Sequence, residues 1–276
     1  MPAIRRIITC FRRWIGCRGV RKGQAPKPPR PNRSLVSSGL LGPVALYTLS
    51  SASDAEKYSS TEMNATQVET SSGEKGGVRV VFLGNSITLH DVAPQIGWTN
   101  RWGMAASAAE KDYVHLVTQG IEQRTGRKVE AKVRNLASFE RNYKTYDFST
   151  ELAEIAGFKP DYLIVALGEN VANLETEEDR RAYADAFRKL LSAFAFSAKP
   201  PRIVVRGVFW PNPSKDAAMK RIADELSVPF VRTDDLGSDS SMKAIGLFAH
   251  PGVANHPGDK GMAATAEHIL GGLFPL

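Results

Sequence analysis

The 276 residues include 42% hydrophobic and 24% charged side chains, a composition typical of a soluble globular protein. The net charge of +7 is unevenly spread: residues 1–34 hold ten Lys and Arg and no Asp or Glu, whereas the rest holds 26 basic and 29 acidic residues. A basic tail on a mildly acidic body argues against nucleic-acid binding by that body. Both cysteines, Cys10 and Cys17, lie in the tail, which excludes a disulfide and a thiolate metal site elsewhere.

The N-terminal region has the pattern of an export signal. Residues 35–49 are fifteen residues without a charge, shorter than the roughly 20 apolar residues of a membrane span. Basic residues precede this run and small residues follow it, as in a signal peptide, and an uncleaved anchor is the alternative. We expect residues 1–55 to be a basic segment with a signal peptide or anchor, and the protein to be exported to the periplasm or secreted. Membrane contact is expected only through this segment, if it is retained.

The folded domain is expected to cover residues 77–276. Residues 56–76 are rich in Ser, Thr and Glu and poor in large apolar side chains, which is typical of a disordered linker. Beyond them, strand-like apolar runs alternate with helical patterns. The strands are expected near 78–83, 129–133, 161–167, 201–210 and 228–232, and the helices near 104–125, 148–156, 176–195, 215–226 and 260–270. This alternation predicts an α/β fold with a mostly parallel, roughly five-stranded sheet covered on both faces.

Ser86 directly follows a predicted strand in the stretch 78–90, VRVVFLGNSITLH. The apolar run before it predicts a strand buried on both faces, and Gly84 and Asn85 end that strand. Open α/β sheets bind their ligands at the carboxyl ends of their strands, where Ser86 would lie. The alternative is a serine that only forms a turn or cap.

Three further stretches should reach the same edge of the sheet. They are NLASFE at 135–140, GEN at 168–170 and HPGDKGM at 256–262. A serine, an asparagine amide and a histidine would then share one cleft. That set provides a nucleophile, a base and an oxyanion donor, which is what acyl transfer requires.

With these four blocks in this order, residues 77–276 resemble the SGNH (GDSL-like) hydrolase superfamily of esterases. The resemblance implies a three-layer α/β/α flavodoxin-like fold and ester hydrolysis without a metal or other cofactor. It implies Ser86 as nucleophile, His256 as general base, and an oxyanion hole of the Ser86 and Glu140 backbone N–H groups with the Asn170 side chain. The sequence departs from the family pattern at three positions: Asn85 replaces an Asp, Glu140 replaces the oxyanion Gly, and Val253 replaces the Asp that precedes the catalytic His.

The missing carboxylate predicts a Ser–His dyad. The backbone carbonyl of Val253 could still accept the Nδ1–H of His256 and fix its tautomer. Asp234 or Asp235 could instead supply a relocated acid, and His250 is a competing base. Asp259 is expected to cap the last helix.

The loop after the nucleophile carries candidate substrate contacts. Trp98 and Trp102 suit the apolar faces of sugar rings, and Arg101 suits a carboxylate or phosphate. Alternatively, the loop folds these aromatics onto the domain. Arg141 could add a polar contact to the cleft.

The sequence therefore predicts a serine esterase that removes acyl groups, with acetyl the first choice, from a carbohydrate or another small ester. An O-acyltransferase with the same residues and an inactive carbohydrate-binding domain are the alternatives. A nucleotide or flavin binder is disfavoured because GNSIT offers few groups to cradle a phosphate. The absence of a G-x-S-x-G motif excludes the other α/β-hydrolase lipases.

Overall fold

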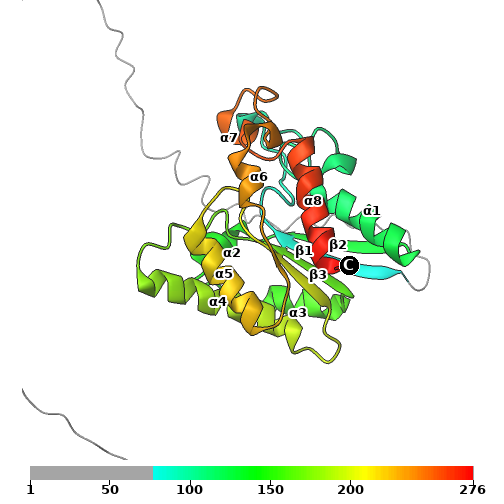
Figure 1. The fold of residues 1–276 in the computed structure, drawn as a ribbon, viewed down its shortest axis with the longest axis vertical. Coiled ribbons are helices and arrows are strands. Elements are labelled where there is room, and N and C mark those ends of the chain that lie inside the picture. The colour runs from blue at the N-terminus through cyan, green and yellow to red at the C-terminus, as the bar shows by residue number, and fades with distance from the viewer. Residues whose placement is uncertain (1–76, 276) are drawn as a thin grey trace, which may run out of the picture. The chain divides into compact units, whose positions relative to one another are not determined.

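The computed structural model describes residues 77–275, so the predictions for residues 1–76 lie outside it. Its sheet has five parallel strands in the order β2-β1-β3-β4-β5 (Figure 1). They are β1 (Val78–Gly84), β2 (Val129–Asn135), β3 (Tyr162–Ala166), β4 (Arg202–Arg206) and β5 (Phe230–Val231). This strand order is that of flavodoxin-like doubly wound sheets. The predicted fold class is confirmed, and the sheet is parallel throughout.

Strand β1 lies inside the sheet, between β2 and β3, because both of its faces are apolar. Val80 and Phe82 face one hydrophobic core and Val81 and Leu83 the other, as the two-residue period of a strand requires. All four are 0% exposed. The apolar run in the sequence thus fixes the central strand that carries Ser86 at its end.

Helices cover both faces of the sheet, giving three layers (Figure 1). One face carries α1 (Tyr113–Thr125) and α8 (Asp259–Leu273), and the other carries α2 (Ala137–Asn142), α3 (Ser149–Phe158), α4 (Glu177–Ala195) and α5 (Pro213–Glu225). The short helices are α6 (Asp234–Ser238), α7 (Pro251–Ala254) and the 3-10 turns Pro94–Ile96, Ala109–Lys111 and Ser240–Met242. Between residues 77 and 275, no helix is both long and apolar enough to cross a bilayer.

Two helix starts differ from the prediction. The first helix was expected from residue 104 but begins at Tyr113, because the Asp112 side chain accepts a hydrogen bond from the N–H of His115 (2.8 Å) and caps it there. The predicted Asp259 cap is wrong: Gly258 is the N-cap, and the Asp259 carboxylate accepts hydrogen bonds from Ser107. Thr176 caps α4, since its side-chain oxygen accepts a hydrogen bond from the N–H of Asp179 (3.0 Å).

A third apolar cluster joins two loops that follow the carboxyl edge of the sheet. It contains Ala93, Trp98, Met104, Ala105, Ala244 and Val253. The cluster packs the loop after Ser86 against the segment that leads to His256. Two parts of the chain about 140 residues apart are therefore held together beside Ser86.

Candidate active site

Ser86 follows β1 through a turn that only glycine permits. A Cβ on Gly84 would lie 1.7 Å from the hydroxyl oxygen of Thr88, so no side chain fits there. The next residue, Asn85, is 0% exposed, and its Oδ1 accepts a hydrogen bond from the N–H of Ile87 (3.2 Å). The turn is thereby fixed on both sides of Ser86, which is itself half-buried.

Ser86 and His256 form a hydrogen-bonded pair. The Ser86 Oγ lies 2.9 Å from His256 Nε2, and His256 Nδ1 lies 2.7 Å from the carbonyl oxygen of Gly252. A carbonyl only accepts, so Nδ1 carries the proton of the neutral ring and Nε2 presents a lone pair to the Ser86 hydroxyl. This is the tautomer that a general base needs.

The carbonyl that orients His256 is not the expected one. The carbonyl of Val253 accepts the backbone N–H of His256 (3.0 Å), and Gly252 supplies the acceptor for the ring. The Val253 side chain is 0% exposed and belongs to the apolar loop cluster. The position that the family fills with a carboxylate is therefore a packing position in this chain.

The surroundings of His256 favour its neutral form. Burial lowers the pKa of the imidazole below its usual value, the Gly252 carbonyl opposes this shift, and His90 adds to it. The ring of Trp210 meets the imidazole edge-on at 5.1 Å between centroids, and its Nε1–H donates to the Asn255 carbonyl (3.1 Å). Sequence reasoning missed Trp210, whose place beside His256 depends on the distant β4 strand.

The alternative acids and the alternative base lie elsewhere. Asp234 pairs with Arg232 (2.7 Å), and neither it nor Asp235 lines the cavity that holds Ser86. In the described chain, His256 accepts or donates no hydrogen bond to a carboxylate. His250 caps α7, since its Nδ1 accepts from the N–H of Val253 (3.4 Å).

The amide of Asn170 is held at both ends. Its Nδ2 donates to Glu140 Oε2 (2.6 Å), and its Oδ1 accepts from Arg141 Nη2 (3.2 Å). These contacts fix which end is the donor and leave the second Nδ2–H without a protein acceptor. The backbone N–H of Ser86 likewise donates to no group in the part of the chain that the structure describes.

Glu140 does not provide the expected oxyanion donor. Its backbone N–H is engaged by the Leu136 carbonyl (3.2 Å) inside α2, a helix that the sequence analysis missed. Its side chain is 0% exposed and accepts from Asn85 Nδ2 (3.0 Å), from the Gly168 N–H and from Asn170 Nδ2. A glutamate at the position where the resemblance expects a glycine therefore orients the Asn170 side chain from behind. The signal available in the sequence was a charged residue at the position where the resemblance expects glycine.

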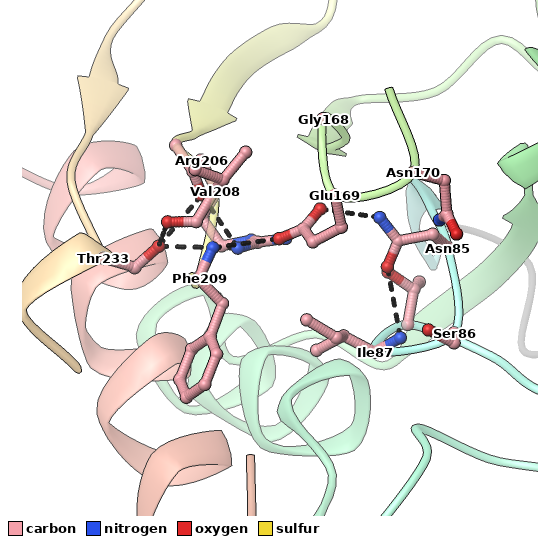
Figure 2. A network of polar contacts seen from close by, with 12 residues as sticks. Asn85, Ser86, Ile87, Gly168, Glu169, Asn170, Arg206, Val208, Phe209 and Thr233 are labelled. Atoms are coloured by element: carbon pink, nitrogen blue, oxygen red, sulfur yellow. Dashed lines mark hydrogen bonds and ion pairs between the residues drawn. The ribbon is translucent and has the colours of Figure 1, made fainter. Parts of the chain in front are cut away.

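A second buried glutamate, Glu169, also contacts Asn85. Figure 2 shows the Glu169 carboxylate between the Arg206 guanidinium (2.7 Å) and the Asn85 amide (2.6 Å). Burial raises the pKa of Glu169, but the charge of Arg206 and the hydrogen bonds from Phe209 N–H, Arg206 and Asn85 together outweigh burial, and the net shift is downward. Burial, and then the charge of Glu169, raise the pKa of Glu140. Arg206 thus pairs with Glu169, and both Glu169 and Glu140 accept hydrogen bonds from the amide of Asn85, the residue before Ser86.

Four of the predicted residues line one cavity of about 300 Å³. They are Ser86, Arg141, Asn170 and His256, and the cavity wall also contains His90, Ile96, Met104, Asn135, Ala137, His250, Gly252 and Val253. Sequence reasoning named His250 only as a competing base and did not name His90 or Asn135 as site residues, although Asn135 ends β2 and His90 lies in the loop after β1.

The other three predicted substrate contacts do not reach this cavity. Trp98 is 0% exposed and packs edge-on against Trp102 and beside Phe248, both at 6.0 Å, so it has no free face for a sugar. Arg101 and Trp102 line a different cavity, beside α1 and β2. The loop folds its aromatics onto the domain, which was the alternative interpretation.

Comparison with known proteins gives distant likenesses. No family model matches, and no curated protein matches. The chain is similar to a protein from Bacteroides uniformis ATCC 8492 described as a GDSL-like lipase (17% identity, TM-score 0.47, covering 71% of this chain and 94% of that one). It is also similar to a family two carbohydrate esterase from Cellvibrio japonicus (18%, TM-score 0.41, 70% and 59%) and to the carbohydrate acetylesterase Est24 from Sinorhizobium meliloti (17%, TM-score 0.41, 57% and 85%).

These matches are to GDSL-like lipases and carbohydrate esterases, so the resemblance predicted from the four motifs is confirmed as a resemblance. Because the TM-scores are below 0.5, the matches carry no weight for an activity. The functional argument rests on the site itself.

Proposed function

We propose that this chain is a serine ester hydrolase. The observation that carries the proposal is the Ser86 Oγ to His256 Nε2 contact of 2.9 Å, with Nδ1 of the same ring fixed by the Gly252 carbonyl. The same pair lines a cavity with an oriented asparagine amide. Nucleophile, base and oxyanion donor are the three groups that acyl transfer needs.

In the proposed reaction, the Ser86 oxygen attacks the ester carbonyl carbon while His256 Nε2 takes the hydroxyl proton. The oxyanion that forms accepts hydrogen bonds from the Ser86 N–H and the second Nδ2–H of Asn170. The intermediate collapses, the C–O bond to the alcohol breaks, and His256 returns the proton to the leaving oxygen. Water then attacks the acyl-serine by the same route, releasing the acid and restoring Ser86.

The missing aspartate does not make the site an inactive binding module. An aspartate fixes the tautomer of the histidine and stabilises its cation, and the Gly252 carbonyl supplies the first of these functions. A dyad is therefore expected to react more slowly than a triad but by the same steps. Acetyl esters of carbohydrates remain the preferred substrate class, because a cavity of about 300 Å³ lies at the lower end of ligand-pocket volumes.

Release of 4-nitrophenol from its acetate ester tests the proposal. Activity should be present in the wild type, absent in Ser86→Ala and retained in Ser149→Ala, an exposed serine at the start of α3. A fluorophosphonate probe should label Ser86 alone. Label at another residue, or turnover that survives Ser86→Ala, would show that the nucleophile is misassigned. Adding a sugar alcohol as acceptor and following ester formation separates hydrolysis from O-acyl transfer.

Export is a separate part of the proposal and is supported only by residues 35–55, which lie outside the described structure. A signal peptidase should cleave after the uncharged run, so the mature chain should begin between about Ala52 and Lys57. N-terminal sequencing of protein from a host that exports it tests this directly. Intact Met1 on soluble cytoplasmic protein would contradict export.

A further inference from the structure

The wall of the catalytic cavity holds one cationic side chain, three imidazoles and no carboxylate. Its titratable or charged members are His90, Arg141, His250 and His256, and no Asp or Glu lines it. Residues 77–276 contain 24 basic and 24 acidic residues, so the domain as a whole gives no such bias. An arginine with no carboxylate beside it in the wall is a property of this cavity.

Arg141 is the permanent charge among them, and no carboxylate within residues 77–275 forms an ion pair with it. One Nη2–H donates to Asn170 Oδ1, and no carboxylate pairs with the guanidinium among the described residues. The side chain is exposed at the cavity. By contrast, Arg188 and Arg232 each form ion pairs shorter than 2.8 Å on the surface. The remaining N–H groups of Arg141 are free to bind an anion in the planar geometry that suits carboxylate, sulfate or phosphate.

The hydrogen bonds of the neighbouring histidines add a donor. His250 Nδ1 accepts the backbone N–H of Val253, so the proton of its neutral ring is on Nε2. His90 Nδ1 lies 2.6 Å from the Asp91 carbonyl and must carry its own proton. His250 therefore offers an Nε2–H donor in its neutral form, whereas neutral His90 presents an Nε2 lone pair. The donors of Arg141 and His250 together favour an acceptor-rich, negatively charged group.

Buried carboxylates do not cancel this arrangement. Glu140 lies on the other side of the Asn170 amide, is 0% exposed, and has its two oxygens bonded to Asn85, Gly168 and Asn170. Glu169 is paired with Arg206. Neither accepts a hydrogen bond from Arg141. They fix the amide that Arg141 also contacts and leave its free N–H groups for a ligand.

We propose that Arg141, assisted by His250, forms a subsite for an anionic group carried by the ester substrate close to its scissile bond. The inference rests on the proposed esterase function. It narrows the substrate to esters bearing a carboxylate, sulfate or phosphate on either the alcohol or the acyl part. For the monoester of a dicarboxylic acid, Arg141 would bind the free carboxylate while Ser86 attacks the ester carbonyl.

Matched ester pairs test the subsite on both parts of the substrate. For the alcohol part, 4-acetoxybenzoate is compared with its neutral methyl ester. For the acyl part, 4-nitrophenyl hemisuccinate is compared with 4-nitrophenyl methyl succinate. Each kcat/KM is divided by the rate of spontaneous hydrolysis. At least one anionic ester should be preferred by about tenfold or more, the size expected for a hydrogen bond to a charged group.

The variants separate recognition from positioning. Arg141→Gln should abolish the anionic preference, Arg141→Lys should retain part of it, and Arg181→Gln, an exposed arginine on α4, should leave it unchanged. If Arg141 only orients Asn170, Arg141→Gln lowers both members of a pair by the same factor. That result, or equal wild-type rates for both members of both pairs, overturns the subsite while esterase activity stands.

A binding measurement keeps the subsite testable without turnover. Calorimetry with Ser86→Ala should give a dissociation constant about tenfold lower for 4-acetoxybenzoate, or for 4-nitrophenyl hemisuccinate, than for the matched neutral ester, and adding Arg141→Gln should remove the difference. If the wild type hydrolyses no ester yet shows this binding preference, the proposed function fails and the anion subsite stands. Equal affinities within both pairs in Ser86→Ala overturn the subsite.

Discussion

Two histidines in this domain are oriented through Nδ1 by different partners, and their pKa values move in opposite directions. His115 Nδ1 lies 2.8 Å from the Asp112 carboxylate, and its pKa is raised, first by that hydrogen bond. His256 Nδ1 lies 2.7 Å from a backbone carbonyl, and its pKa is lowered, first by burial. A carboxylate stabilises the imidazolium, whereas a carbonyl selects the tautomer without adding a negative charge.

An Asp–His pair, which the family resemblance predicts beside Ser86, is thus found at His115 instead. His115 lines the cavity of about 250 Å³ beside α1 and β2, and Asp112 is 1% exposed and caps α1. No hydroxyl in residues 77–275 hydrogen-bonds to His115. At His256 the Ser86 hydroxyl lies on the other ring nitrogen, and no carboxylate of the described residues contacts the ring. An Asp–His contact therefore does not by itself identify a catalytic base. The better indicator is a hydroxyl that hydrogen-bonds to the other ring nitrogen, as Ser86 does at His256.

The largest expected difference is in kcat/KM, between a variant of His256 and a variant of His115. His256→Gln removes the base, and kcat/KM for 4-nitrophenyl acetate should fall by about a thousandfold or more. His115→Gln should change it by less than about twofold, because that ring contacts neither Ser86 nor the cavity around it. Comparable losses in two folded variants would mean that the two sites are coupled or that the base is misassigned.

Asn170→Ala should rank next. Its amide is oriented to donate to a charge that develops in the transition state, so kcat should fall by roughly a hundredfold while KM changes little. The steady-state constants for 4-nitrophenyl acetate measure this split. Unchanged kcat in a folded variant would make Asn170 a turn residue, whatever its contact with Arg141.

Glu140→Gln tests whether the buried carboxylate acts through Asn170. Glutamine has one acceptor oxygen, so its NH2 group would face an N–H donor and at least one hydrogen bond would be lost. We expect kcat to fall by about tenfold and the free energy of unfolding to fall by about 1–3 kcal/mol. In the Asn170→Ala background the same change should leave kcat nearly unaffected. A full additional tenfold loss there would contradict positioning through Asn170.

The pH profile should show a smaller effect. Because the pKa of His256 is lowered, the base stays neutral to lower pH, and the acidic limb of kcat/KM should fall below about 6.5. A triad would place that limb higher by stabilising the imidazolium. A limb above 7 in the wild type would show that a negative charge reaches the ring. Replacing Val253 with Asp would not supply this negative charge, because position 253 is buried in the apolar loop cluster.

The sequence predicts the parts of this structure that depend on local pattern. The apolar run of β1, the glycine turn and the order of four polar blocks place Ser86, Asn170 and His256 at one sheet edge, because parallel strands end together. It does not predict that the Glu140 N–H is consumed by a short helix, since that helix lacks a clear apolar period. Nor does it show whether Trp98 faces a ligand or the core, because a loop's packing depends on its partner segment, here residues 244–253.

The smallest effect concerns stability at the other histidine. The folded pKa of His115 is raised, so its charged form stabilises the fold fully below the unfolded pKa of about 6.5, and that stabilisation is lost as the pH rises through the folded pKa. The pair is partly exposed, with 31% of the His115 side chain accessible, so its contribution is about half a kcal/mol, or about 1–2 °C in Tm. The Tm of the wild type should exceed that of His115→Gln by this amount at pH 5 and by less at pH 8. In Asp112→Asn, which keeps the capping oxygen but removes the charge, the pH-dependent part should vanish. A difference that instead grows from pH 5 to pH 8 would show that the neutral ring, and not the ion pair, stabilises this corner of the domain.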